Sequence, residues 1–452
     1  MEYNSQAKII SYNLDSSAVC ASAARISTTI GSANKIFEDS KTNSNNDQLI
    51  KKVLRSGHRS IIEHAFFTIA LCNVSAFVEQ FFIEFRLASF TVKSRRYVDF
   101  SDQGYYIPED LTGEDLRFYC EYMDMLFDAY QKLLELDIPK EDARFLLPYS
   151  FNSNFYCTIN ARELINLLQA VKKGRGRTIT ELQHLADQII KQIAGIFPCI
   201  IDELDCADES THTPDRSNIA INKNPVFLTE DRVGNVRLIN CPNDPKLIFE
   251  TAYKITDPFP KDPINYKQII NSDRPRCLEQ LTYSFLISDI TLSGITHIVR
   301  HRMQSVIIPS IKSIDHFKYI IPRTILENPD AEKLYRRTLI HAGEMLCSVK
   351  ESGRLSQYLY YFAVSGNVMD IMTTLNAREL LLFIRLRTCS RAQWEVKDIA
   401  LNMLRHLRNH FPELFNAYGP SCFIRGECPE GRMSCGKMKE VVKKFKAEQS
   451  KN

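Results

Sequence analysis

Two arginines and a histidine occupy consecutive positions at Arg300, His301 and Arg302. The guanidinium group of arginine matches the oxygens of a phosphate with a fork of donors, and it keeps its charge near neutral pH. Apolar residues stand on both sides of this cluster, and charged side chains between buried segments need a bound partner. The pattern therefore favours a site for a phosphate-bearing ligand over a solvated surface face.

A short motif, Asn-Ala-Arg-Glu-Leu, occurs at residues 160–164 and again 216 positions later, at 376–380. The same offset joins three further identical pairs: Glu63 with Glu279, Arg86 with Arg302, and Ser89 with Ser305. A weaker similarity, with a small insertion, relates Ala24–Ser27 to Tyr253–Thr256. One gapless register over well separated segments predicts that the chain is a tandem duplication of one domain.

The cationic cluster and the residues after it have diverged in opposite directions in the two copies. At the positions of Arg300 and His301 the first copy has Glu84 and Phe85. At the positions that follow, the first copy has Ser94, Arg95, Arg96 and Tyr97, whereas the second copy has Ser310, Ile311, Lys312 and Ser313 and keeps only the serine. Each copy therefore keeps the half of a motif that the other has lost.

Both copies have the patterning of an α+β domain. Apolar residues recur with helical spacing over 114–136, 160–172, 330–350 and 376–410, whereas 65–72 and 281–288 are typical of strands. We expect two tandem domains, each an antiparallel sheet with long helices, docked as a pseudo-twofold pair, because each copy retains a self-complementary surface. The expected boundaries are a first domain at 1–206, a linker at 207–224, a second domain at 225–420, and a Cys-containing loop with a basic tail at 421–452.

The composition is that of a globular protein with little net charge. The 452 residues carry 57 Lys and Arg against 54 Asp and Glu, a net charge of +3, which gives no general attraction to nucleic acid or membranes. An amphipathic surface helix explains the basic segment 405–410 without a nucleic-acid partner. The start of the chain has neither a membrane-spanning apolar stretch nor the pattern of a signal peptide. We therefore expect a cytoplasmic protein that binds neither nucleic acid nor a membrane.

Three of the thirteen cysteines, Cys422, Cys428 and Cys435, lie close together in the tail. Three thiols could hold a metal, but structural zinc sites need four ligands with paired close spacings. Several other cysteines lie in apolar runs that are typical of reduced core residues. We expect free thiols in the tail and no metal.

The two retained half-motifs are Arg-His-Arg-x-x-Ser from residue 300 and Ser-x-Arg-Tyr from residue 94. Together they resemble the signature of the flavin-dependent thymidylate synthases, the ThyX family. Three more segments are similar to motifs of that family: His58–His64 to its flavin segment, Ala23–Ser27 to an N-terminal motif, and 376–395 to a long helix near the C-terminus. The resemblance implies an α+β homotetramer that uses FAD, NADPH and methylenetetrahydrofolate to methylate dUMP to dTMP. It also implies active sites between subunits, so that a fused pair could divide the site residues between its copies.

Carried over position by position, the resemblance implies a nucleotide site drawn from both copies. The implied nucleotide ligands are Arg300 and Arg387, which would also be the catalytic residues, with His297 in the second copy and Ser94, Arg96 and Arg144 in the first. The implied flavin ligands are Ser27, His58, Ser60, Glu63, Asn160 and Arg162 in the first copy and Arg300, His301, Arg302, Asn376 and Arg378 in the second. Tyr360 stands in the second copy for Arg144, and Val171 stands in the first copy for Arg387. Two alternatives stay open: His58 as a helix-terminal or core histidine, and the asparagines at 160 and 376 as helix caps.

The sequence departs from the family pattern at several positions of its motif. A usual Asn and Glu are replaced by Thr91 and Val92 in the first copy and by Ile307 and Ile308 in the second, and a usual glutamine by Phe81 and His297. These departures favour a non-catalytic relative that binds FAD or a pyrimidine nucleotide in a regulatory role. The reciprocal retention of arginines favours a working enzyme, because decay would remove groups without regard to the copy. We therefore expect a flavin-dependent thymidylate synthase that is active as a homodimer in place of the tetramer.

Overall fold

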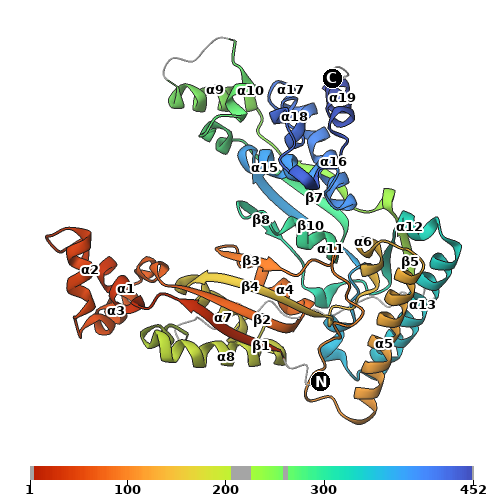
Figure 1. Ribbon diagram of the computed structural model, residues 1–452, viewed down its shortest axis with the longest axis horizontal. Helices are drawn as coiled ribbons and strands as arrows, with labels where there is room; N and C mark the ends of the chain where they lie inside the picture. Colours follow the sequence, from red (N-terminus) through yellow and green to blue (C-terminus); the bar gives the residue numbers. More distant parts are fainter. Residues whose placement is uncertain (1–4, 205–224, 258–262, 450–452) are drawn as a thin grey trace. The chain divides into compact units, whose positions relative to one another are not determined.

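The computed structural model describes residues 5–204, 225–257 and 263–449, which form two compact units (Figure 1). Unit 1 comprises Met1–Glu135, Leu147–Ser217 and Ser348–Phe362. Unit 2 comprises Leu136–Leu146, Asn218–Cys347 and Ala363–Asn452. The linker expected at 207–224 lies outside the described residues.

A four-stranded antiparallel sheet forms the centre of unit 1. Its strands follow the order β1 (Gln6–Tyr12), β2 (Phe66–Ser75), β4 (Asn152–Asn160) and β3 (Ala88–Val92). Apolar residues alternate along β2, so that Phe67, Ile69 and Leu71 are buried on one face. Helices α7 (Ala161–Lys172) and α8 (Thr180–Ile196) pack against each other, and α8 also contacts β1 (Figure 1).

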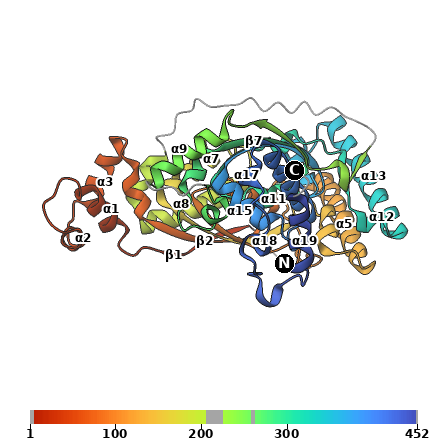
Figure 2. The same ribbon diagram turned by 90° about the horizontal axis from the view of Figure 1, so that it is seen from above.

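The N-terminal helices of unit 1 gather at one end of its sheet in both views (Figures 1 and 2). They are α1 (Ser16–Arg25), α2 (Ala33–Lys41), α3 (Asn46–Arg55) and the 3₁₀ helix η1 (Arg59–His64). The 3₁₀ helix η1 contacts α1 and α3 on one side and α7 on the other. The same unit contains α4 (Ala76–Ile83), α5 (Gly113–Glu135) and α14 (Leu359–Phe362).

Unit 2 is built around a sheet of the same order. Its strands are β6 (Asn235–Asn240), β7 (Thr282–Thr291), β10 (Val368–Asn376) and β8 (Gln304–Ile307), all paired antiparallel. Helix α16 (Trp394–His410) contacts α11 (Leu292–Ile298), α15 (Ala377–Arg387), β6 and β7. A parallel pair, β5 (Val226–Thr229) with β9 (Lys318–Ile321), is an addition that the sequence did not indicate.

The other helices of unit 2 are mostly short. They are α6 (Lys140–Ala143), α9 (Pro245–Thr256), α10 (Tyr266–Ile270), α12 (Arg323–Leu326), α13 (Pro329–Ser352, which continues into unit 1 from Ser348), α17 (Pro412–Phe415), α18 (Ser421–Arg425) and α19 (Met438–Gln449). Among the described residues, the helices lack the combined length and apolarity of a membrane span.

The two sheets repeat each other residue by residue, which confirms the tandem duplication. Strands β2 and β4 pair in the register that joins Phe66 to Asn160, and β7 and β10 pair in the register 216 positions later. Asn73 and Asp289, again 216 positions apart, both adopt a left-handed backbone conformation, with φ of 53° and 56°. Asn and Asp tolerate this conformation better than other non-glycine residues. The duplication thus preserves even a local backbone irregularity.

Each unit also includes a segment from the opposite copy. The exchanged segments are Leu136–Leu146, a first-copy segment in unit 2, and Ser348–Phe362, a second-copy segment in unit 1. In unit 2 the indole nitrogen of Trp394 donates to Asp142 at 2.9 Å. In unit 1 the hydroxyl of Tyr361 donates to Glu181 at 2.7 Å. Each compact unit therefore includes a short segment of the opposite copy, and the domain boundaries expected from the sequence stay a prediction.

Most elements expected from the patterning are confirmed. The helices at 114–136 and 330–350 are α5 and α13, and the strands at 65–72 and 281–288 are β2 and β7. The helical segment at 376–410 is divided instead into α15 and α16. Gln393 begins the second of these helices as its N-cap, where its side chain accepts a hydrogen bond from the backbone N–H of Val396 at 3.0 Å.

Candidate functional site

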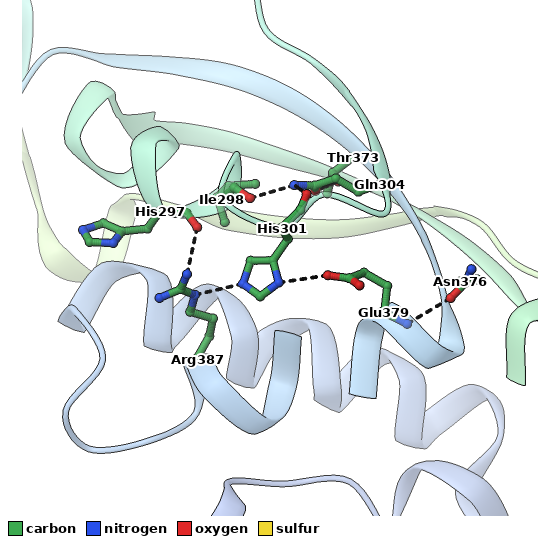
Figure 3. A network of polar contacts seen from close by, with 8 residues as sticks. All are labelled: His297, Ile298, His301, Gln304, Thr373, Asn376, Glu379 and Arg387. Carbon is green, nitrogen blue, oxygen red and sulfur yellow. Dashed lines mark hydrogen bonds and ion pairs between the residues drawn. The ribbon is translucent and has the colours of Figure 1, made fainter. Parts of the chain in front are cut away.

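His301 lies at the centre of a polar network in unit 2 (Figure 3). Its ring is buried, with 4% of the residue exposed. The Nδ1 atom lies 3.0 Å from Oε1 of Glu379, and Nε of Arg387 donates to the Nε2 atom at 3.1 Å. Arg387 also donates through Nη2 to the backbone carbonyl of His297 at 3.2 Å. The imidazole therefore stands between a carboxylate and a guanidinium group.

The protonation state of His301 follows from these partners. Because the guanidinium group of Arg387 can only donate, Nε2 of the imidazole must be the acceptor and carry no proton. The proton is then on Nδ1, from which it is donated to the carboxylate of Glu379. The geometry thus corresponds to a neutral imidazole in one defined tautomer.

Helix α15 sets the spacing of the two charged partners. Asn376 caps this helix by accepting from the backbone N–H of Glu379 at 2.9 Å, which places the carboxylate in the first turn. Arg387 ends the helix eight residues after Glu379, and the two lie on the same side of it because two successive steps of four residues follow one i, i+4 row. The ring of Phe383 lies between them and meets His301 edge-on, with centroids 4.8 Å apart.

A second set of contacts fixes the loop that carries His301 between α11 and β8. The side-chain amide of Gln304 donates to the carbonyls of Ile298 at 2.6 Å and His301 at 2.8 Å. The hydroxyl of Thr373, on the neighbouring strand β10, donates to the side-chain oxygen of Gln304 at 2.6 Å. The loop is therefore tied to the sheet, whereas Arg300 and Arg302 on either side of His301 are exposed.

Arg144 reaches unit 2 on the exchanged segment, although it belongs to the first copy. It is 2% exposed, and Nε donates to the carbonyl of Glu141 at 2.9 Å. Its charge acts on Glu395, whose carboxylate accepts from the backbone N–H and the hydroxyl of Thr291 at 2.7 and 2.6 Å. Burial raises the pKa of Glu395 to about 7, while the Thr291 hydrogen bonds and the Arg144 charge act in the opposite direction.

Helix α11 connects these two groups of residues. Thr291 is its N-cap, and His297, whose carbonyl accepts from Arg387, lies in its last turn. At a rise of about 1.5 Å per residue this helix is about 10 Å long. Unit 2 therefore contains all three arginines: Arg387 contacts the last turn of α11, Arg300 follows that helix in the chain, and the charge of Arg144 acts on the carboxylate that contacts its N-cap.

The chain was compared with known proteins. The model of the thymidylate synthase complementing protein family matches residues 8–199 and 252–413, well over half of the chain and one region in each copy. The chain belongs to this family.

The relatives of this protein differ in how much of the chain they match. A flavin-dependent thymidylate synthase of Clostridium tetani is 32% identical over 184 residues, 37% of this chain and 74% of that protein. One of Geobacter sulfurreducens is 29% identical over 183 residues, 40% of this chain and 78% of that protein. The UPF0159 protein of Thermoplasma acidophilum is 24% identical over 474 residues, 87% of this chain and 91% of that protein. The first two relatives therefore match less than half of the duplicated chain, whereas the third spans most of it.

Solved structures are similar to part of this family chain. The UMP/dUMP methylase PolB of Streptomyces cacaoi has a TM-score of 0.38 at 23% identity, covering 46% of this chain and 98% of its own. ThyX of Helicobacter pylori, solved with FAD and dUMP, has a TM-score of 0.37 at 21% identity, covering 44% and 99%.

In the first domain, three positions of the polar network are occupied by apolar residues. Phe81, Phe85 and Val171 stand where the second domain has His297, His301 and Arg387. Arg175 lies over the ring of Phe81 at 4.4 Å and pairs with Glu84. The space that corresponds to the network of unit 2 is therefore lined by aromatic rings.

The first domain instead contains a buried ion pair beside the other half of the motif. Arg95 donates through Nη2 to Glu79 at 2.8 Å, and both side chains are less than 5% exposed. The hydroxyl of Ser153 donates to the second carboxylate oxygen of Glu79. The backbone N–H of Arg96 donates to the Ser94 hydroxyl at 3.3 Å, so this buried pair anchors the loop that carries both expected nucleotide ligands.

The expected flavin ligands of the first copy lie on contacting elements of unit 1. Ser27, His58 and Ser60 are exposed near the ends of α1 and η1. His58 precedes η1 without capping it through its side chain, so it is a helix-terminal histidine and not a core residue. Glu63 pairs with Arg162 at 2.6 Å, and the same pair recurs in unit 2 between Glu279 and Arg378.

The two asparagines of the repeated motif are helix caps. Asn160 accepts from the backbone N–H of Glu163 at 2.9 Å, as Asn376 does from Glu379. The capping interpretation is confirmed, and a flavin contact by either asparagine stays a prediction. The cap also explains why the whole motif is retained in both copies although its glutamate contacts a histidine in only one.

The tail cysteines have a neighbour that their spacing did not reveal. Burial chiefly raises the pKa of the Cys422 thiol, and the thiols of Cys389, Cys428 and Cys435 lie near enough to add to this shift. Cys389 follows α15, more than thirty positions earlier in the chain. Within the described residues, no three His, Cys, Asp or Glu side chains are arranged to hold a metal ion.

The basic segment 405–410 lies within α16. Arg408 is buried, donates to Glu448 at 3.1 Å and donates to the carbonyl of Tyr418 at 3.3 Å. His406 contacts the carbonyl of Val236. These two basic side chains therefore serve packing within unit 2.

Proposed function

We propose that this protein is an FAD-dependent thymidylate synthase, which methylates dUMP to dTMP with methylenetetrahydrofolate and NADPH at sites pooled from its two unlike copies. The observation that carries the proposal is the exchange of Leu136–Leu146 into unit 2. That segment brings Arg144 into the unit that contains Arg300 and Arg387, whereas the reverse exchange brings Tyr360 into unit 1. The exchange therefore adds a third arginine of the implied nucleotide-binding set to unit 2, where several guanidinium groups could bind one anionic ligand.

The nucleotide phosphate would be bound by arginines from both copies. Arg300 and Arg387 supply the contribution of the second copy, with His297 beside them. Ser94 and Arg96 supply the contribution of the first copy, on the loop that the buried Glu79–Arg95 pair anchors. The proposed catalytic role of Arg300 and Arg387 is to stabilise negative charge that develops next to the bound pyrimidine.

The residues of unit 1 fit a flavin cofactor in chemical type. Exposed hydroxyl and imidazole groups at Ser27, His58 and Ser60 offer the donors that a cofactor phosphate and sugar need. Glu63 and Arg162, with Asn160 at the start of α7, would orient it, and Arg302, Asn376 and Arg378 would contribute from the second copy. When bound, FAD supplies the transfer of reducing equivalents, and the residues of this chain bind and orient the reactants.

The fusion would also change the assembly. Because one chain carries two copies of the domain, a cytoplasmic homodimer would replace a tetramer of single domains. The first domain would contribute binding groups without forming a complete nucleotide site of its own, since Phe81, Phe85 and Val171 replace the polar groups there.

The test is to purify the protein, record its visible spectrum and measure dTMP formation from dUMP, methylenetetrahydrofolate and NADPH under reducing conditions. We expect a yellow protein that forms dTMP. Arg300→Ala should abolish this activity, and Glu84→Ala at the corresponding position of the first copy should not. A yellow protein that binds nucleotide without forming dTMP would identify the regulatory alternative instead.

A further inference from the structure

The buried ring of His301 makes contacts that differ from those of a cofactor ligand. Both of its ring nitrogens contact protein groups, Glu379 on one side and Arg387 on the other (Figure 3). The resemblance implied a flavin contact for this side chain, but its polar atoms point along helix α15. The function of the ring must therefore be sought in what it does to Arg387.

The chain itself provides a comparison without the histidine. In the first copy, Phe85 replaces His301 and Val171 replaces Arg387, while Glu163 is kept at the position of Glu379. Glu163 there accepts from the side chain of Asn166 at 3.1 Å. The histidine and the arginine have thus been lost together, and the glutamate has been kept without them.

The neutral imidazole of His301 separates two opposite charges, the carboxylate of Glu379 and the guanidinium group of Arg387. Glu379 is buried, with 7% of the residue exposed, and a buried carboxylate attracts a nearby guanidinium group strongly. The imidazole receives the Nε hydrogen of Arg387 on one edge and donates to Glu379 on the other, so the arginine does not close onto the carboxylate. The plane of the guanidinium group is then fixed by His301 and by the carbonyl of His297.

We propose that His301, held in its Nδ1-protonated tautomer by Glu379 and in its neutral form by the donating guanidinium group of Arg387, is a positioning residue that aims Arg387 at the bound nucleotide. The identity of the ligand in this inference rests on the proposed function. The contacts of His301 with Glu379 and Arg387 do not depend on it. The groups that face the ring are Glu379 and Arg387 from α15, with Arg300 and Arg302 next to it in its own loop.

The first experiment measures dUMP binding to the flavin-loaded protein by calorimetry at pH 8. His301→Phe, which introduces the residue of the first copy, should weaken binding about tenfold or more, the effect of losing a hydrogen bond to a charged group. His301→Gln should remain within about threefold of the parent, because the glutamine amide can accept from Arg387 and donate to Glu379. Flavin content should be equal in all three proteins.

A double variant separates positioning from general packing. In an Arg387→Ala background the His301→Phe change should cause no further loss, since the two act on one contact. A loss for His301→Phe that persists in full without Arg387 would overturn the proposal.

A third measurement does not depend on the substrate. In NMR spectra of protein labelled with ¹⁵N-arginine, the Nε–H signal of Arg387 is the one that Arg387→Ala lacks. This signal should be protected from exchange with solvent in the parent and in His301→Gln but not in His301→Phe. If the parent binds no dUMP yet this pattern holds, the proposed function fails and the positioning contact stands. If the signal is unchanged in His301→Phe, the positioning contact itself is wrong.

Discussion

At the scale of single residues, the two domains have distributed buried charge differently. Unit 1 keeps Glu79, Arg95 and Ser153 as a buried polar cluster, and 216 positions later the second copy has Ile295, Ile311 and Met369. Apolar replacement of a buried ion pair is often neutral or stabilising. Retention of the pair in the first copy is therefore explained better by the loop it anchors than by stability.

Replacing this cluster in unit 1 tests that explanation. Arg95→Ala alone should lower the free energy of unfolding by about 3–5 kcal/mol, because it leaves the Glu79 carboxylate buried and unpaired. The triple variant Glu79→Ile, Arg95→Ile, Ser153→Met introduces the residues of the second copy and should lose much less stability. Urea unfolding measures both, and calorimetry should show that the triple variant nevertheless binds dUMP more weakly, since the Arg96 loop has lost its anchor. Parent affinity in the triple variant would contradict the anchoring function.

A second prediction concerns the buried carboxyl of Glu395. Its pKa is raised from 4.5 to about 7 by burial, so the folded protein binds this proton at a higher pH than the unfolded chain does. The stability that the carboxyl contributes is therefore present below pH 4.5 and is lost as pH rises towards 7, by about 3 kcal/mol at most. Glu395→Gln should flatten the decrease of the urea midpoint between pH 5 and pH 8, whereas Glu440→Gln, an exposed control, should not. Parallel profiles for the parent and Glu395→Gln would show that the carboxyl does not titrate in this range.

At the scale of elements, helix α7 after strand β4 and helix α15 after strand β10 begin in the same way. Asn160 and Asn376 pair within their sheets and cap α7 and α15 with hydrogen bonds of equal length, 2.9 Å. In unit 2 this start places Glu379 and Arg387 on one face of α15. In unit 2 the N-cap asparagine therefore sets both the start of the helix and the positions of Glu379 and Arg387 along it.

The caps can be tested as a matched pair. Asn160→Ala and Asn376→Ala should each lower the free energy of unfolding by about 1 kcal/mol, and the corresponding Asp variants should be close to the parent, because aspartate caps as well as asparagine does. Urea unfolding provides the measurement. Only Asn376→Ala should also weaken dUMP binding, through Glu379 and Arg387. Equal effects of the two alanine variants on dUMP binding would disconnect the cap from the nucleotide site.

Patterning predicted the repeated elements because they depend on local periodicity. Strands β2 and β7, helices α5 and α13, and the 216-residue register could all be recognised from the order of residues. The inclusion of Leu136–Leu146 in unit 2 could not, since it depends on tertiary contacts such as Trp394 with Asp142, which leave no local pattern in the sequence. The break between α15 and α16 covers the largely polar residues 388–393, and it was missed because the apolar spacing on both sides of it was interpreted as one helix.

The residues of the candidate site also divide into those that the sequence indicated and those that it did not. The arginines were recognised from a motif, but the carboxylate that contacts His301 was not, because Glu379 lies in a segment that is identical in both copies. Because this segment is the same in both copies, its sequence did not indicate that the glutamate contacts a histidine in the second copy alone. The buried Glu79 and Glu395 were also missed, since single carboxylates inside apolar sequences do not reveal their burial or their partners.

At the scale of the whole molecule, duplication explains how two copies could each lose half of a motif. Once both copies are on one chain, a group is needed from either copy and not from each. The first copy then kept Ser94, Arg96 and Arg144, and the second kept Arg300 and Arg387. One nucleotide site per chain is expected in place of two.

Calorimetric titration of dUMP into the flavin-loaded protein tests the pooling of residues most directly. The parent should bind one dUMP per chain, and Arg96→Ala from the first copy and Arg387→Ala from the second should each weaken binding by about a hundredfold, since each removes a charged hydrogen-bond donor to phosphate. Lys312→Ala, at the position in the second copy that corresponds to Arg96, should bind like the parent. If Arg96→Ala binds dUMP with parent affinity, the two copies do not share a nucleotide site.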